Sequence, residues 1–109
     1  MTISKLITVA VAMTATALTL SASEPKEIFE KTCSKCHGLD GKGDTKMGKK
    51  LEIKDFTTAA FQGTFTDKQA ASAIKEGIKD GDKIRMKAYD DLSDAEITGL
   101  VAYVRALKK

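Results

Sequence analysis

The stretch from residue 30 to residue 45 reads EKTCSKCHGLDGKGDT, and it contains both cysteines and the only histidine of the 109-residue chain. Cys33, Cys36 and His37 form the pattern C-x-x-C-H. Three kinds of site use such a cluster: a thioredoxin-like dithiol, a structural zinc site and a covalent haem attachment. The rest of the chain discriminates among them.

A dithiol redox site needs its C-x-x-C pair at the start of a helix within a strand–helix–strand unit. Here Ile28, Phe29 and Cys33 follow helical spacing, so the pair falls near the end of a helix. A structural zinc site normally needs four ligands. The chain offers two cysteines and one histidine, with no second C-x-x-C or H-x-x-H. Both alternatives are therefore disfavoured.

Haem attachment gives this spacing a geometric reason. Two cysteines three positions apart lie on the same side of a helical turn, where they reach the two vinyl groups on one edge of the haem. The next residue then places an imidazole under the ring to ligate iron, and C-x-x-C-H is typical of c-type haem. We therefore expect one covalent haem c, with Cys33 and Cys36 forming the thioethers and His37 as an axial iron ligand.

Residues 1–23 have the pattern of a secretory signal peptide. Lys5 is followed by the uncharged run 6–22 and then by small residues, which predicts cleavage after Ala22 or Ser23. A retained membrane anchor is the alternative, since the run is near the shortest length that spans a bilayer. We expect a periplasmic or otherwise exported protein with one monohaem domain at 24–109. So small a domain, without tryptophan, is expected to fold poorly without its haem.

The mature chain is predicted to be all-α, because period-2 strand patterns are absent. The first expected helix is SEPKEIFEKTCSKCH, residues 23–37. A second begins at the capping box of Thr66 and Gln69, and a third at that of Ser93 and Glu96.

The second axial ligand is expected to be a methionine, because a thioether opposite histidine is typical of electron-transfer haem. Met47 lies ten residues after His37, too close for the chain to pass around the haem edge, and is expected to fill the core or face solvent. Met86 lies 49 residues after His37 and just before the last helix. Met86 is the predicted ligand.

The stretches IFEKTCSKCHGLDGKGD and MKAYDDLSDAEITGLVAYVRAL together resemble the class I (small monohaem) cytochromes c of the short bacterial type. The resemblance implies the cytochrome c fold: N- and C-terminal helices that cross, with a middle helix and loops wrapped around one haem. It also implies that Phe29, Leu100 and Tyr103 pack the last helix against the first. Gly99, one turn before Tyr103, would permit a close approach.

The chain departs from this family at two places. Lys87 follows the predicted methionine ligand where the family often has proline, and Pro25 stands where the family often has a small residue. Because Pro25 is the only proline, the one that commonly packs near the histidine is missing. We expect a carbonyl in the Asp44–Leu51 loop to support the His37 ring instead.

The predicted function is one-electron transfer by a monomeric carrier that is not an enzyme. The alternatives are a haem c electron-entry subunit of a larger membrane-associated oxidoreductase and a gas-binding haem protein. The expected partners are redox proteins, and membrane insertion is expected only if the leader is retained. The net charge of +3 falls to +2 without Lys5, and no aromatic platform is evident, so nucleic acid is not an expected partner.

Lysines are concentrated in the loop after the haem motif and around Met86. Acidic residues are interleaved with them, so plain solvation is one interpretation. The other is a basic rim at the haem edge that steers partners with acidic docking patches. The residues concerned are Lys42, Lys46, Lys49, Lys50, Lys54, Lys83, Arg85 and Lys87.

Overall fold

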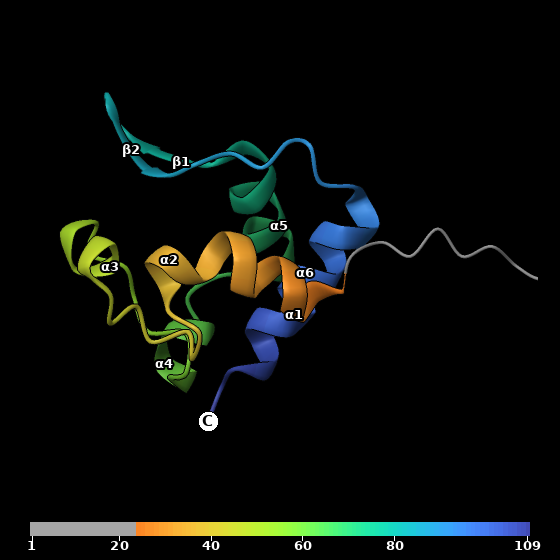
Figure 1. Cartoon of the computed structure of the whole chain (residues 1–109), viewed down its shortest axis with the longest axis horizontal. Helices are drawn as coiled ribbons and strands as arrows, with labels where there is room; N and C mark the ends of the chain where they lie inside the picture. The colour runs from red at the N-terminus through yellow and green to blue at the C-terminus, as the bar shows by residue number, and fades with distance from the viewer. Residues whose placement is uncertain (1–23) are drawn as a thin grey trace, which may run out of the picture.

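The computed structural model describes residues 24–109, so the predicted signal peptide at 1–23 lies outside the described residues. Most of the described chain is helical, and Figure 1 shows the helices packed around one another with a hairpin at one side. In chain order the elements are α1 (Pro25–Ile28), the π-helical η1 (Phe29–Cys33), α2 (Ser34–His37), α3 (Lys46–Lys50), α4 (Ala59–Gln62), α5 (Asp67–Glu76), β1 (Ile78–Asp80), β2 (Lys83–Met86) and α6 (Asp94–Ala106).

Helices α1, η1 and α2 follow one another without a break and confirm the predicted first helix. Pro25 occupies the first turn, where its missing N–H costs no hydrogen bond. Gly38 ends the helix with φ of 80°, a backbone conformation that glycine adopts without strain. The π-helical turn, in which the Ser34 N–H donates to the Phe29 carbonyl, was not predicted.

Helices α5 and α6 begin at the two predicted capping boxes. The Gln69 N–H donates to Thr66 Oγ1 over 3.1 Å, and the Glu96 N–H donates to Ser93 Oγ over 3.1 Å. In each box the N3 side chain accepts a hydrogen bond from the N-cap backbone, so two otherwise unpaired N–H groups are satisfied.

The core lies where α1 and η1 pack against α6, as the resemblance implied (Figure 1). Phe29 and Leu100 are each 1% exposed, and the Phe29 ring lies 5.0 Å from that of Tyr103. A Cβ atom at Gly99 would be 2.7 Å from Pro25 Cγ, so only glycine permits this approach of the two helices. The expected roles of Phe29, Leu100, Tyr103 and Gly99 are confirmed.

The all-α prediction is wrong at residues 78–86, where β1 and β2 form an antiparallel hairpin. Gly81 and Asp82 are the two loop residues, and Gly81 has φ of 61°. A Gly-Asp pair between two short runs is a recognised hairpin signal. The strands are only three and four residues long and mostly charged, which is why their alternation was not evident.

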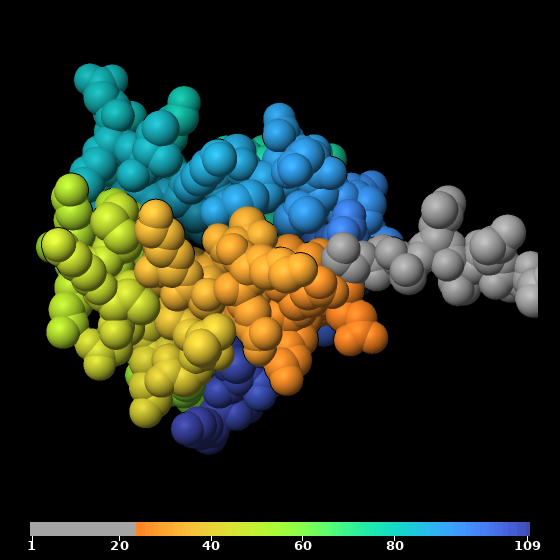
Figure 2. All heavy atoms as spheres, viewed as in Figure 1, coloured from red at the N-terminus to blue at the C-terminus, as the bar shows by residue number. Residues whose placement is uncertain are grey.

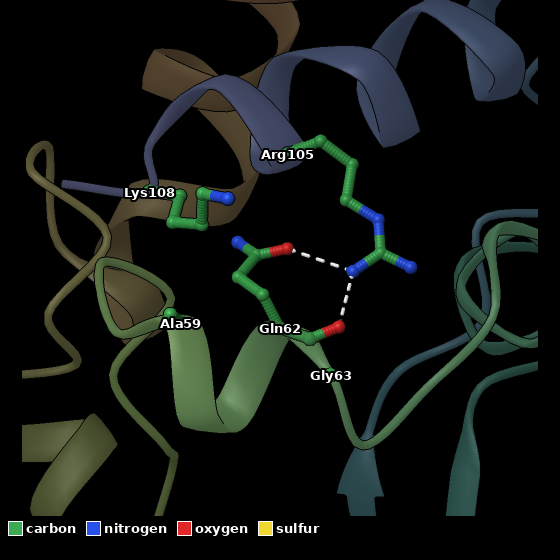
Figure 3. Close-up of a pocket in the computed structure, with 5 residues that line it drawn as sticks. All are labelled: Ala59, Gln62, Gly63, Arg105 and Lys108. Carbon is green, nitrogen blue, oxygen red and sulfur yellow. Dashed lines mark hydrogen bonds between the residues drawn. The ribbon is translucent and has the colours of Figure 1, made fainter.

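The last turn of α6 is attached to α4 through one buried amide and one guanidinium. Gln62 Nε2 donates to the carbonyls of Phe56 (2.7 Å) and Val104 (2.9 Å). The Arg105 guanidinium donates to both oxygens of Gln62 (Figure 3). It also lies 4.3 Å from the centre of the Phe65 ring. No helix within residues 24–109 has the length and apolar character needed to cross a membrane.

Candidate haem-binding site

The structure places Cys33, Cys36 and His37 together at the C-terminal end of the first helix. All three are partly buried, and no disulfide joins the two cysteines. Cys33 also packs against the core formed by Ile28, Phe29 and Leu100. The motif is therefore attached directly to the helix crossing.

Burial raises the pKa of the Cys33 thiol to about 11, with a smaller contribution from Cys36. The reactive cysteine of a dithiol oxidoreductase has the opposite property, because its pKa is lowered to stabilise a thiolate. Among the described residues, no three His, Cys, Asp or Glu side chains converge as they would around a metal ion. The environment of Cys33 therefore differs from that of a redox dithiol, and the described residues around the motif do not form a cluster of metal ligands.

The His37 imidazole is a neutral ligand held in a buried position. Burial lowers its pKa to about 4, so the ring carries no charge at pH 7 and retains a lone pair for a metal. Nδ1 is the one side-chain nitrogen or oxygen of residues 24–109 that is buried without a hydrogen-bond partner. The expectation that a carbonyl of the Asp44–Leu51 loop supports the ring is therefore wrong in this structure.

An aromatic ring supports His37 instead. Phe56 stacks on the imidazole with ring centres 4.6 Å apart and planes 22° apart, and the ring centre of Phe29 lies 6.5 Å from that of His37. The Phe56 N–H donates to the Gly41 carbonyl over 2.8 Å, and its own carbonyl accepts from Gln62. Phe56 was not predicted, because stacking between residues 19 positions apart leaves no local pattern in the sequence.

The loop after His37 folds back onto the motif. The Gly43 N–H donates to the His37 carbonyl (2.7 Å), and Thr45 Oγ1 donates to the Cys36 carbonyl (2.7 Å). Thr45 Oγ1 also accepts from the Gly48 N–H, which caps α3. Met47 lies in α3 and so remains on the segment that is bonded to the motif.

Met86 is the last residue of β2 and is partly buried. Its backbone packs on the end of α5 at Gly77, where a Cβ atom would be 2.6 Å from the Met86 carbonyl oxygen. Three residues later, the Tyr89 N–H donates to the Ile74 carbonyl over 2.8 Å. The Tyr89 hydroxyl then lies 3.5 Å from the carbonyl of Thr32, next to Cys33. The segment that carries Met86 is thereby brought to the helix that carries the motif.

Two shallow pockets in the described part of the chain lie away from the motif. One is bounded by α4 and α6 and is lined by Gln62, Arg105 and Lys108 (Figure 3). The other lies between α5 and α6, beside Lys75 and Ile97. Neither is lined by Cys33 or by His37.

A model of the family described as cytochrome c oxidase, cbb3-type, subunit III matches residues 20–104. The chain belongs to this cytochrome c family. Among solved structures, the KustC0563 c-type cytochrome superposes with a TM-score of 0.68 at 28% identity, over 79% of this chain and 99% of that one. Comparison with the curated proteins gave no match.

The cofactor of this c-type cytochrome is covalently bound haem c, which serves electron transfer with redox partner proteins. The residues at the motif fit that group. Two cysteines that form no disulfide lie one helical turn apart, and a neutral imidazole with an unpartnered nitrogen follows them. Haem supplies an iron centre that changes its charge by one electron, and the surrounding side chains set its ligation and solvent exposure.

Proposed function

We propose that the chain is a one-electron carrier with a single haem c. Cys33 and Cys36 hold the haem through thioethers, and His37 and Met86 are the axial ligands of the iron. The observation that carries the proposal is the placement of both cysteines and a neutral histidine at the end of a helix built into the core. Because both axial positions are filled, no substrate reaches the iron, and the protein is not an enzyme.

Two contacts favour Met86 over Met47 as the second ligand. The loop bearing Met47 is bonded through Thr45 to the Cys36 carbonyl, so it stays with the histidine side of the site. The segment bearing Met86 arrives from α5 and reaches the motif independently, through Tyr89.

The absorption spectrum of the ferric protein tests this ligation. A His/Met haem has a weak sulfur-to-iron charge-transfer band, which we expect in the wild type and in Met47→Ala but not in Met86→Ala. A wild-type protein that lacks the band and binds carbon monoxide readily would instead be a gas-binding protein. Retention of the band in Met86→Ala would exclude Met86 as the ligand.

A second candidate function is the electron-entry subunit of a membrane-associated oxidoreductase. The observation that favours it is the description of the matching family as an oxidase subunit. Membrane fractionation separates the two: a free carrier is recovered in the periplasmic fraction, whereas a subunit is recovered with membrane proteins. The leader is tested in the same preparation, since the mass of the holoprotein shows whether it is cleaved after Ala22 or Ser23 or is retained.

We infer that the basic rim is a docking surface for acidic redox partners. The segments bearing it meet in space, because Arg85 of β2 donates to the carbonyl of Leu51 at the end of α3. Figure 2 shows α3, the hairpin and the helix that carries the motif on the same face of the molecule. Lys46, Lys50 and Lys83 are exposed there. Such a surface raises association rates with anionic partners at low salt.

Oxidation by small complexes of opposite charge measures this field at the haem edge. With hexacyanoferrate(III) as the anionic oxidant, the rate should fall as salt rises and fall further in Lys46→Glu/Lys50→Glu/Lys83→Glu. A cationic cobalt(III) complex should show the opposite trends. Lys68→Glu on α5 is the control, because Lys68 is exposed outside this surface. Salt-independent rates with both oxidants would favour plain solvation.

A further inference from the structure

Arg85, the residue before Met86, connects the hairpin to the segment that follows the haem motif. Its Nη1 donates to the Leu51 carbonyl over 3.2 Å and lies 3.4 Å from Glu52 Oε2. Its Nη2 donates to Asp80 Oδ2 of β1 over 3.2 Å. The side chain is 31% exposed, so these contacts are partly shielded from water.

The hydrogen bonds of Arg85 attach β2 to the end of α3 and to β1. Between residues 24 and 109, no other side-chain hydrogen bond joins β2 to a different segment. Beyond Met86, the chain is fixed by packing on Gly77 and by the Tyr89–Ile74 hydrogen bond. Met86 is thus held from both sides, and on its N-terminal side the fixed point is Arg85.

The turn at Leu51 and Glu52, which accepts hydrogen bonds from Arg85, has an unusual backbone conformation. Glu52 has φ of 56°, the left-handed conformation that a residue with a side chain adopts rarely. In this conformation its carboxylate and the preceding carbonyl both face the guanidinium. The backbone of this turn therefore presents two acceptors to the one guanidinium of Arg85.

We propose that Arg85 is a positioning residue that holds Met86 in place for iron ligation. The proposal rests on Met86 being the axial ligand. Arginine suits the role because its planar fork presents several N–H groups in fixed directions, here toward one carbonyl and two carboxylates. Lysine would carry the charge without that geometry. The hydrogen bonds of Arg85 connect the segment that follows His37 with β2, the strand that ends at Met86. They therefore join the two segments that carry the proposed iron ligands.

Displacement of methionine by added imidazole tests this role, since imidazole binds the iron only when the thioether leaves. The variants are Arg85→Gln and Arg85→Lys in the holoprotein. Lys79→Gln is the matched control, because Lys79 is exposed in β1 of the same hairpin and its side chain makes no hydrogen bond or ion pair among residues 24–109. Loss of a partly exposed charged hydrogen-bond set should tighten apparent imidazole binding about five- to tenfold in Arg85→Gln. Arg85→Lys should give a smaller change, and Lys79→Gln none.

A merely structural role is separated by far-ultraviolet circular dichroism in urea. If Arg85 positions Met86, the sulfur-to-iron band of Arg85→Gln disappears at a lower urea concentration than in the wild type, while the midpoint of helix loss shifts much less. Equal shifts of both transitions would overturn the positioning role, as would unchanged imidazole binding. Failure of the ligation proposal looks different: the wild type then lacks the band, or Met86→Ala retains it.

Discussion

The substitution Gly99→Ala tests whether the helix crossing depends on the absence of one side chain. The new methyl group would lie 2.7 Å from Pro25 Cγ, well inside van der Waals contact, and the closed proline ring can move that atom only slightly, by changing its pucker. Overpacking of this kind costs about 1 to 3 kcal/mol. Alanine in the middle of α6 contributes about 1 kcal/mol of helix propensity in the opposite direction. The net expectation is a loss of about 1 kcal/mol.

Urea unfolding of the ferric holoprotein, followed by helical circular dichroism, measures this loss. In a thermal melt of the same protein, a loss of about 1 kcal/mol corresponds to a fall in Tm of about 4 to 8 °C for a domain of this size. Gly63→Ala is the control, because Gly63 has a helical backbone and a Cβ atom there would be 3.5 Å from its nearest neighbour. It should be neutral or slightly stabilising.

A double-mutant cycle with Pro25→Ala isolates the contact. Once Pro25 Cγ is removed, the Gly99→Ala methyl group has room, and the propensity gain should appear in full. The interaction energy between the two substitutions should then be about 1 kcal/mol or more, in favour of the double variant. An interaction energy near zero would refute the close-approach explanation, and so would a Gly99→Ala variant more stable than the wild type.

Three further substitutions test other parts of the molecule. Gln62→Leu removes the buried amide that donates to two partly buried carbonyls and should cost about 2 to 4 kcal/mol in urea unfolding; a cost below about 1 kcal/mol would contradict the bonding. Ser93→Ala removes the cap of α6 and should cost about 1 kcal/mol, whereas Ala102→Ser on the exposed face of the same helix should change little. Cys33→Ala/Cys36→Ala should not retain haem after dialysis and should lose much of its helical circular dichroism, because bound cofactor stabilises the fold; native-like dichroism would contradict this.

The sequence allowed the ends of the helices to be predicted because their signals are local. Thr66 and Ser93 each act on a residue three positions away, and Gly38 ends its own helix. The motif was recognisable for the same reason, since its three residues lie within five positions. The crossing partners of Phe29 came only from the resemblance to a family.

The contacts that hold His37 and the Met86 segment in place could not be predicted, because each joins residues far apart in the sequence. Phe56 stacks on His37 across 19 positions, and Arg85 reaches Leu51 across 34. Neither residue has a neighbour that marks its role. Because the family's proline is missing, a carbonyl was expected to support the His37 ring, whereas the structure places the aromatic face of Phe56 against it.

The segments that carry the two proposed iron ligands differ in how many buried contacts hold them in place. The helix that carries His37 shares the core, with Phe29 only 1% exposed, whereas Ile84 of β2 is 58% exposed and the hairpin depends on a few hydrogen bonds. Segments with few buried contacts open at lower free energy than the core. Amide hydrogen exchange of the holoprotein should therefore be faster at residues 78–86 than at 28–37 and 97–104. Protection of the hairpin equal to that of the crossing would contradict this order, and would mean that the haem itself, rather than the protein contacts, holds the Met86 side closed.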